Sequence, residues 1–310
     1  MTFSTARLQQ NGFYIIELKS DAGTSVQIIP SYGALLHAFE YMHKGQKINL
    51  IDSYKNSDEM KAQVAGSFKS VKLSPFACRI KDAQYSWEQK DYTISKSPIH
   101  GLLYDQVFEI IAEEATPEYA SVSLQHKYKG TDPGYPFAYT CDVQYRLLKG
   151  NALEVTTTIT NEHSAPIPMM DGWHPYFSTG TPVDQLELQF HSKEIVEFNE
   201  QLIPTGKVLP YTDFRQSKSM EGVSLDNSFV LDFDQPSPLC TLHDPLKGIS
   251  IEFYPEKSYP ILQIYTPPHR KSIAVENLTG APNAFNNGIG LVTIPAGQSA
   301  RFTTTTKIKA

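Results

Sequence analysis

Cysteine is scarce in this 310-residue chain, and its few copies argue against a disulfide scaffold and a zinc ribbon. Cys78, Cys141 and Cys240 are widely spaced, and no Cys-x-x-Cys pair occurs. A free cysteine usually packs as a small hydrophobic residue, so we expect three buried thiols. The sequence gives no support for a bound metal.

Positive charge is not concentrated anywhere along the chain. Charged residues make up 19% of the sequence, the formal net charge is -6, and Lys and Arg form no cluster. Binding to a phosphate backbone depends on clustered cationic side chains. We therefore expect no nucleic-acid partner.

Long apolar runs are also missing. No segment approaches the roughly 20 consecutive apolar residues that span a bilayer, and residues 1–10 lack the basic start and apolar centre of a signal peptide. We expect a soluble, cytoplasmic protein with no membrane partner, either a monomer or a homodimer.

Long helices are not favoured, because 21 prolines spread along the chain would interrupt them. Only residues 57–64 have a helical pattern. Apolar and polar side chains alternate over residues 121–128 and 139–147, as is typical of half-buried strands. Turn residues at 149–151 and another alternating run at 153–159 complete a predicted hairpin with long arms.

Shorter extended runs separated by turn residues occur along the whole chain, at residues 13–18, 25–29, 35–41, 106–111, 185–190, 249–254, 261–265 and 301–308. Many short strands with turn signals predict an all-β fold of antiparallel sheets, arranged as a sandwich or a barrel. No linker, repeat or low-complexity block divides the sequence, and its 40% hydrophobic content can fill one core. We expect a single domain over residues 1–310.

One stretch concentrates aromatic rings around a titratable side chain. Residues 171–177 read Asp-Gly-Trp-His-Pro-Tyr-Phe, and Pro175 favours an extended backbone at His174. The rigid, aromatic surroundings are compatible with two interpretations. His174 is either a proton donor in a water-poor site or a core histidine whose nitrogens are satisfied.

Two further segments have polar residues beside apolar or glycine positions. Arg79 follows an apolar stretch, so its guanidinium either reaches the surface or offers a fork of donors to a polar ligand. His100 precedes Gly101, where the missing side chain would let a ligand or another strand approach closely.

Two acidic residues also have a structural and a functional interpretation. Asp226, next to Asn227 between apolar flanks, fits an Asx-type turn, which local evidence favours over a ligand-binding role. Glu276 ends the apolar run at 273–276, as either a solvated strand end or a half-buried acid. Burial would raise the pKa of the Glu276 carboxyl toward the range of a general base.

Taken together, these motifs resemble the aldose 1-epimerase (galactose mutarotase) family, most closely its shorter branch with a His-Pro-Tyr-Phe motif. Residues 172–177 carry the resemblance, and so do residues 275–285, which read Val-Glu-Asn-Leu-Thr-Gly-Ala-Pro-Asn-Ala-Phe. The resemblance extends from roughly Tyr32 to the C-terminus. Shorter matches follow in family order, at residues 78–80, 100–102, 134–137 and 225–227.

The resemblance implies a large antiparallel β-sandwich with a sugar-binding groove across one sheet. It implies that Glu276 is the general base for the anomeric hydroxyl and that His174 is the general acid for the ring oxygen. Arg79, His100 and Asp226 would bind ring hydroxyls of a monosaccharide. A carboxylate and an imidazole can exchange these protons in both directions near neutral pH without a cofactor.

Substrate choice stays open at this point. The typical galactose-active branch has threonine where this chain has Pro175, and another branch acts on hexose 6-phosphates, which arginine binds well. Arg270 is near Glu276 in sequence and keeps a phosphate site possible. We expect an epimerase for a free aldohexose. A hexose-6-phosphate epimerase, a non-catalytic sugar-binding protein and a glycoside hydrolase, which generally needs two carboxylates, are the alternatives.

Overall fold

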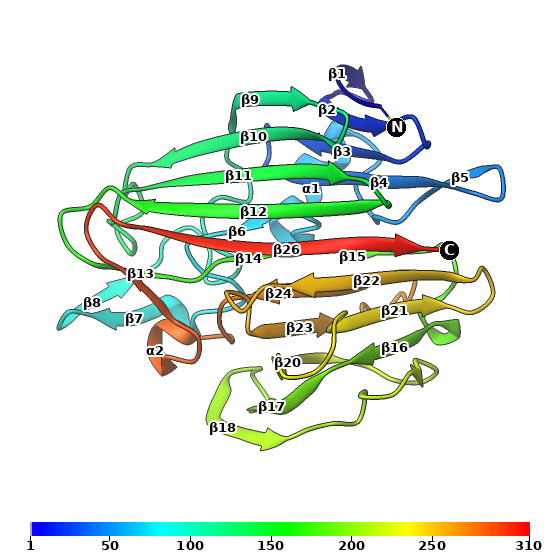
Figure 1. The fold of residues 1–310 in the computed structure, drawn as a ribbon. Coiled ribbons are helices and arrows are strands. Elements are labelled where there is room, and N and C mark those ends of the chain that lie inside the picture. The colour runs from blue at the N-terminus through cyan, green and yellow to red at the C-terminus, as the bar shows by residue number, and fades with distance from the viewer. Residues whose placement is uncertain (1) are drawn as a thin grey trace.

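The computed structural model describes residues 2–310, and most of its regular structure is β-strand. Its two largest sheets have nine and eight strands, and neighbouring strands in both are antiparallel (Figure 1). The all-β sandwich that the sequence predicts is confirmed.

The nine-stranded sheet contains the long hairpin expected from the alternating pattern. β11 (Tyr139–Leu148) and β12 (Ala152–Asn161) pair over their full lengths, and buried residues alternate with half-buried ones along most of β11. The other strands of this sheet are β9 (Glu109–Ala115), β10 (Tyr119–Tyr128), β16 (Glu187–Phe190), β19 (Lys218–Ser219), β21 (Cys240–Asp244), β22 (Ile249–Pro255) and β26 (Ser299–Lys309).

The eight-stranded sheet is made of shorter strands from distant parts of the chain. In spatial order they are β18 (Pro204–Pro210), β17 (Ser192–Phe198), β20 (Asp226–Leu231), β23 (Ile261–Tyr265), β24 (Ile273–Leu278), β14 (Gly172–Trp173) and β6 (Lys72–Leu73), and β15 (Tyr176–Phe177) also pairs with β24.

A five-stranded meander and two small antiparallel strand pairs complete the sheets. The meander is β1 (Phe3–Gln10), β2 (Phe13–Ser20), β3 (Ser25–Ile29), β4 (Leu35–His43) and β5 (Gln46–Asn49); the pairs are β7 (Gln84–Trp87) with β8 (Lys90–Thr93), and β13 (Ile167–Met169) with β25 (Val292–Ile294).

Side chains from the two large sheets meet in the interior of the sandwich. Trp173 of β14 packs edge-on against Tyr145 of β11, and their ring centroids are 6.3 Å apart. On β24, the Asn277 side-chain oxygen accepts a hydrogen bond of 2.8 Å from the Thr304 hydroxyl of β26. One face of the eight-stranded sheet is therefore buried against the nine-stranded sheet.

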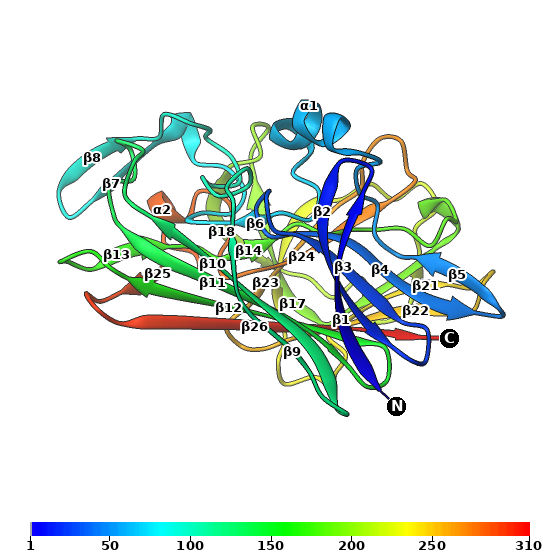
Figure 2. The same cartoon turned by 90° about the horizontal axis from the view of Figure 1, so that it is seen from above.

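The predicted helix lies over the other face of the eight-stranded sheet (Figure 2). α1 (Ser57–Ser67) begins where the Asn56 side chain accepts a hydrogen bond from the Glu59 amide, as a helix cap does. It ends at Phe68, whose left-handed backbone lets its amide bond the Val64 carbonyl. A second helix, α2 (Ala284–Asn287), is a single turn that the sequence pattern did not predict.

Several strand predictions need correction. Residues 106–108 are not in a strand, because the Phe108 amide and the Gln106 carbonyl bond the loop at Pro30 and Gly33 instead of a sheet neighbour. β1 was missed because most of its residues are exposed and alternate poorly. Within residues 2–310, the structure contains no helix that is long and apolar enough to cross a membrane.

Candidate active site

Strand pairing brings together the two side chains that were predicted to exchange protons. In the pairing of β15 with β24, Tyr176 is opposite Ala274. Two residues before Tyr176 and two residues after Ala274, the same antiparallel register puts His174 opposite Glu276. His174 Nε2 lies 3.4 Å from Glu276 Oε1, although the residues are about a hundred positions apart in sequence.

Gly172 lets β14 approach β24 closely. Gly172 pairs with Leu278. The register of β14 against β24 is thus the same as that of β15, which follows Pro175. A Cβ at position 172 would lie 2.4 Å from Leu278 Cδ2 and 3.2 Å from the Ala77 Cβ. The absence of a side chain at Gly172 therefore helps to set the distance across which His174 faces Glu276.

A row of polar side chains continues from Glu276 across the sheet. Gln263 of β23 is opposite Glu276, and Ser228 of β20 is opposite Gln263. The Gln263 amide nitrogen donates a hydrogen bond of 2.9 Å to Asp226 Oδ1, while its oxygen accepts one from the Ser228 hydroxyl. Gln263 is thus held on both sides and fixes the orientation of the Asp226 carboxylate.

Arg79 and His100 come from two loop segments that are bonded to each other. The His100 amide donates to the Cys78 carbonyl at 2.8 Å, and Arg79 forms an isolated bridge with Ile99. Next to His100, a Cβ on Gly101 would lie 2.3 Å from the carbonyl oxygen of Ser74, which directly follows β6 and forms an isolated bridge with Gly101. The close approach expected at Gly101 is confirmed.

The two imidazoles are packed among aromatic rings. His174 stacks on Tyr176 with ring centroids 4.9 Å apart, and the edge of its ring meets His100 at 4.7 Å. His100 in turn packs against Phe68, which follows α1. This packing restricts the orientations that both imidazoles can adopt.

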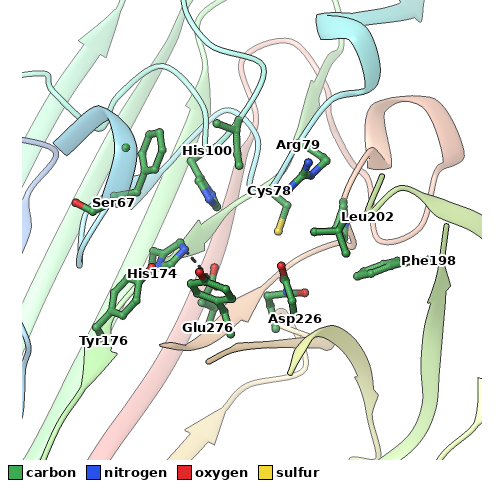
Figure 3. A pocket seen from close by; sticks show the side chains of 16 residues that line it. Ser67, Cys78, Arg79, His100, His174, Tyr176, Phe198, Leu202, Asp226 and Glu276 are labelled. Atoms are coloured by element: carbon green, nitrogen blue, oxygen red, sulfur yellow. Dashed lines mark hydrogen bonds and ion pairs between the residues drawn. The ribbon is translucent and has the colours of Figure 1, made fainter. Parts of the chain in front are cut away.

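All five predicted site residues line one cavity of about 230 Å³. Figure 3 shows His174 and Tyr176 on one side of it and Leu202 and Phe198 on the other. Arg79, His100, Asp226 and Glu276 lie between these two walls. The pocket therefore combines a polar floor with partly apolar sides, as is typical of sites for small ligands.

Other lining residues were not predicted as site residues. Tyr176 belongs to the aromatic motif, but its position two residues after His174 was not used. Gln263 gave a signal, because it is a polar residue inside the apolar run 261–265. Phe198 and Leu202 gave none, since the hairpin of β17 and β18 was not predicted.

Burial shifts the pKa values of His174 and Glu276 in opposite directions. It lowers the pKa of His174 to about 4, and it raises the pKa of Glu276 well above the usual range for a carboxyl, with a smaller contribution from the charge of Asp226. Both shifts favour the uncharged form of the side chain. In the uncharged arrangement His174 is a neutral imidazole and the proton of the pair resides on the Glu276 carboxyl.

Three fully buried polar atoms at the site have no hydrogen-bond partner among residues 2–310. They are Glu276 Oε2, His100 Nδ1 and His174 Nδ1. Buried polar atoms in folded proteins are nearly always hydrogen-bonded. These atoms, which belong to side chains lining the cavity, are suited to bond a polar ligand there.

Charge at the far end of the pocket is balanced by one cation. Burial raises the pKa of Asp226, while the nearby Arg79 guanidinium and the hydrogen bond from Gln263 act to lower it. Burial also lowers the pKa of His100 well below its usual value, and His174 and Arg79 add to this effect. His100 is accordingly neutral, with one ring nitrogen able to donate and one able to accept.

Two local interpretations are corrected by the fold. Asp226 is not in an Asx-type turn, because residues 226–231 form β20 and pair with β23. Glu276 does not end its strand, since β24 continues to Leu278 and leaves Glu276 only 1% exposed. The half-buried acid that we considered is in fact fully buried.

Arg270 does not reach the pocket. Its Nε donates to Asp184 Oδ2 at 2.8 Å, and its two terminal nitrogens donate to the Val223 and Met220 carbonyls at 2.9 and 2.8 Å. The possible phosphate role of this arginine at the same site is therefore contradicted.

The three thiols are free and buried, as predicted. Cys78 lines the pocket, and burial raises its pKa well above the usual range for a thiol. In the part of the chain that the structure describes, no group of three or more His, Cys, Asp or Glu side chains is arranged to hold a metal ion.

The fold and the site together define a class of protein: an antiparallel β-sandwich with a polar pocket on one sheet. In the pocket a histidine faces a glutamate, and an arginine, a second histidine and an aspartate lie beside them. The profile of the aldose 1-epimerase family matches residues 14–307, and the chain belongs to this family. The resemblance found in the motifs is confirmed.

Individual relatives of this chain share less than 30% of its sequence. The uncharacterized Escherichia coli (strain K12) protein YihR is 28% identical over 244 residues, which cover 74% of this chain and 76% of YihR. A GalM/aldose epimerase homologue from C. elegans has a similar fold, with a TM-score of 0.85, 21% identity and 99% of each chain covered. Galactose 1-epimerase from Lactobacillus acidophilus NCFM gives a TM-score of 0.82 at 19% identity, with 99% of this chain and 98% of that chain covered.

Proposed function

We propose that this protein is an aldose 1-epimerase that interconverts the α and β anomers of a free aldohexose. The observation that carries the proposal is the buried cross-strand pair of His174 and Glu276, 3.4 Å apart, in a pocket with Arg79, His100 and Asp226. Membership of the family and the fold shared with a galactose 1-epimerase support it.

Ring opening of a cyclic hemiacetal requires two proton transfers. Glu276 removes the proton from the anomeric hydroxyl, whose oxygen becomes the carbonyl oxygen as the bond between C1 and the ring oxygen breaks. His174 donates a proton from Nε2 to the departing ring oxygen. Rotation about the C1–C2 bond and the reverse transfers then close the ring on the other face.

The reactive form of the pair has a carboxylate and an imidazolium. Burial favours a protonated Glu276 and a neutral His174, and moving the proton from Glu276 to His174 across the 3.4 Å between them creates this form without exchange with solvent. Burial disfavours both charges, so the ion pair is a high-energy, reactive state. Each positioned acid or base typically contributes about 10² to 10⁴-fold to the rate.

Arg79, His100 and Asp226 orient the sugar. The neutral imidazole of His100 offers both a donor and an acceptor, Arg79 offers several donors, and Asp226 accepts. Holding the ring hydroxyls in this way keeps the anomeric carbon at Glu276 and the ring oxygen at His174, which is the positional contribution to catalysis.

The charge of the pocket favours a neutral sugar over a sugar phosphate. Arg79 is the one Lys or Arg among the 16 lining residues, and its charge already interacts with the Asp226 carboxyl. Recognition of a phosphate group usually employs arginine forks without competing carboxylates. Arg270 is bonded to Asp184 and two carbonyls instead.

Polarimetry of freshly dissolved α-D-glucose, α-D-galactose and hexose 6-phosphates tests the proposal. We expect faster equilibration of at least one free aldose than in buffer alone, and a loss of about 10² to 10⁴-fold in kcat for Glu276→Gln and for His174→Asn. Equal rates with and without the protein for every sugar would refute the epimerase. A calorimetric titration that detects sugar binding without turnover would instead support a binding protein.

A further inference from the structure

We propose that a buried ion pair between Lys72 and Asp171 positions His174 against Glu276 from the opposite side of the sheet. Lys72 Nζ donates to Asp171 Oδ2 at 2.6 Å and to the Gly172 carbonyl at 2.7 Å. The side chains of Lys72 and Asp171 are 3% and 0% exposed. The kinetic part of this inference rests on the proposed function, whereas its structural part does not.

The ion pair lies between the two large sheets and not in the pocket. Lys72 pairs with Trp173, and the Trp173 ring faces Tyr145 of the nine-stranded sheet. Neither Lys72 nor Asp171 lines the cavity. The sugar therefore has no direct contact with either side chain in the proposed mechanism, and any effect on the reaction passes through the strand.

The strand before His174 has few hydrogen bonds of its own. β14 has only two residues, and Pro175, which follows His174, has no amide hydrogen to donate. The carbonyl of His174 is bonded by the Ser70 amide at 2.8 Å, and that of Pro175 by the Val275 amide at 3.3 Å. Such a short segment needs other contacts to keep a fixed distance from β24.

Asp171, which directly precedes β14, is bonded to both β6 and the segment that follows β24. It therefore connects the three segments that determine the distance between His174 and Glu276. Its carboxylate accepts a hydrogen bond from Lys72 on β6. Its backbone makes two hydrogen bonds with Thr279, which directly follows β24: the Asp171 amide donates to the Thr279 hydroxyl at 3.0 Å, and the Thr279 amide donates to the Asp171 carbonyl at 2.9 Å. The Tyr259 hydroxyl donates to the same carboxylate oxygen as Lys72, at 2.5 Å.

Charges buried in this way are not explained by stability alone. Burial raises the pKa of Asp171, and Lys72 and Tyr259 act against that shift. Apolar residues of similar volume often stabilise a fold as well as a buried ion pair does, whereas an ion pair specifies one geometry. Here the specified geometry is that of the backbone at Asp171 and Gly172, three and two residues before His174. A displacement of about 1 Å at a reacting group can cost about 10²-fold in rate.

The double variant Lys72→Met/Asp171→Leu separates positioning from stability. It removes both charges and keeps apolar volume, so we expect it to fold. We expect kcat for the aldose that the wild type converts to fall by about 10²-fold, with KM unchanged because Arg79, His100 and Asp226 are not altered. A folded double variant with wild-type kcat would overturn the proposal.

A matched control removes an ion pair that is remote from the pocket. Arg146 and Glu154 lie opposite each other on β11 and β12, with Arg146 Nη1 2.9 Å from Glu154 Oε1. We expect Arg146→Met/Glu154→Leu to leave kcat and KM unchanged. If this control loses kcat to the same extent, the effect is not specific to Lys72 and Asp171, and the proposal fails.

Two measurements keep the inference testable if the double variant does not fold or if the wild type converts no sugar. Tyr259→Phe removes the hydroxyl that donates a hydrogen bond to Asp171. We expect this variant to lower kcat without changing KM, and by a smaller factor than the double variant does. NMR titration of the His174 imidazole needs no turnover: we expect its pKa, about 4 in the wild type, to rise in Tyr259→Phe or the double variant as its packing loosens. An unchanged His174 pKa in a folded variant would overturn the positioning role even if the epimerase proposal had already failed.

Discussion

Both members of the pair of His174 and Glu276 are held by burial in forms that carry no charge. At 4% and 1% exposure, neither side chain can be solvated as an ion. In the proposed mechanism a proton passes from Glu276 to His174, whose Nε2 lies 3.4 Å from Glu276 Oε1. At the scale of the residue, the proposed mechanism thus keeps the proton for ring opening where solvent has little access.

The burial of His174 has a consequence for stability against pH. Its folded pKa of about 4 is below the ordinary value of 6.5, so the unfolded chain binds this proton more tightly than the folded chain does. We therefore expect the free energy of unfolding of the wild type to decrease, relative to that of His174→Asn, as the pH falls from about 6.5 to about 4. Urea unfolding at several pH values measures this difference, and a constant difference over that interval would contradict it.

At the scale of the element, the short segments β14, β15 and β24 matter more than the long hairpins. Gly172 permits the close approach of β14 to β24, and Pro175 separates β14 from β15, so His174 lies in a gap between two paired segments. The alternating pattern at 139–159 predicted the longest hairpin, but a two-residue strand leaves no periodicity to detect. Its register depends on tertiary packing, which the sequence pattern does not contain.

Gly172 and Leu278 provide a test of this close approach. We expect Gly172→Ala to lower the free energy of unfolding by about 1–3 kcal/mol, because its Cβ would overlap Leu278 Cδ2. Leu278→Ala should cost about 2–5 kcal/mol as a cavity. In the double variant the new methyl group fills part of that cavity, so the combined loss should be smaller than the sum.

Chemical denaturation of the four proteins in this cycle measures the coupling, and strictly additive losses would contradict it. Gly66→Ala in α1 is a suitable control. Apart from its chain neighbours and the backbone of its own helix, nothing lies within 4 Å of the Cβ position at Gly66, so we expect no loss, or a gain of about 0.5–1 kcal/mol from the better helix former.

At the scale of the whole molecule, the sandwich gathers chain segments that sequence alone can identify but not assemble. The motifs around Arg79, His100, His174, Asp226 and Glu276 were identified from the sequence, and the fold brings all five to one cavity. The apolar wall of the cavity could not be predicted, because its hairpin has no clear alternating pattern. Nor could the partner of Lys72, which is 99 positions away and buried between sheets.

The interior of the sandwich makes the two charges of the buried ion pair strongly interdependent. Lys72→Met alone leaves the Asp171 carboxyl without its cation in a fully buried position, and we expect this variant to lose about 3–5 kcal/mol of unfolding free energy. Lys72→Met/Asp171→Leu should recover most of that loss, because it removes the uncompensated charge as well. Urea unfolding of wild type, single and double variants at neutral pH measures both effects. If Lys72→Met is as stable as the wild type, Tyr259 compensates the buried carboxyl without Lys72. If the double variant is less stable than Lys72→Met, the two charges stabilise the sandwich itself.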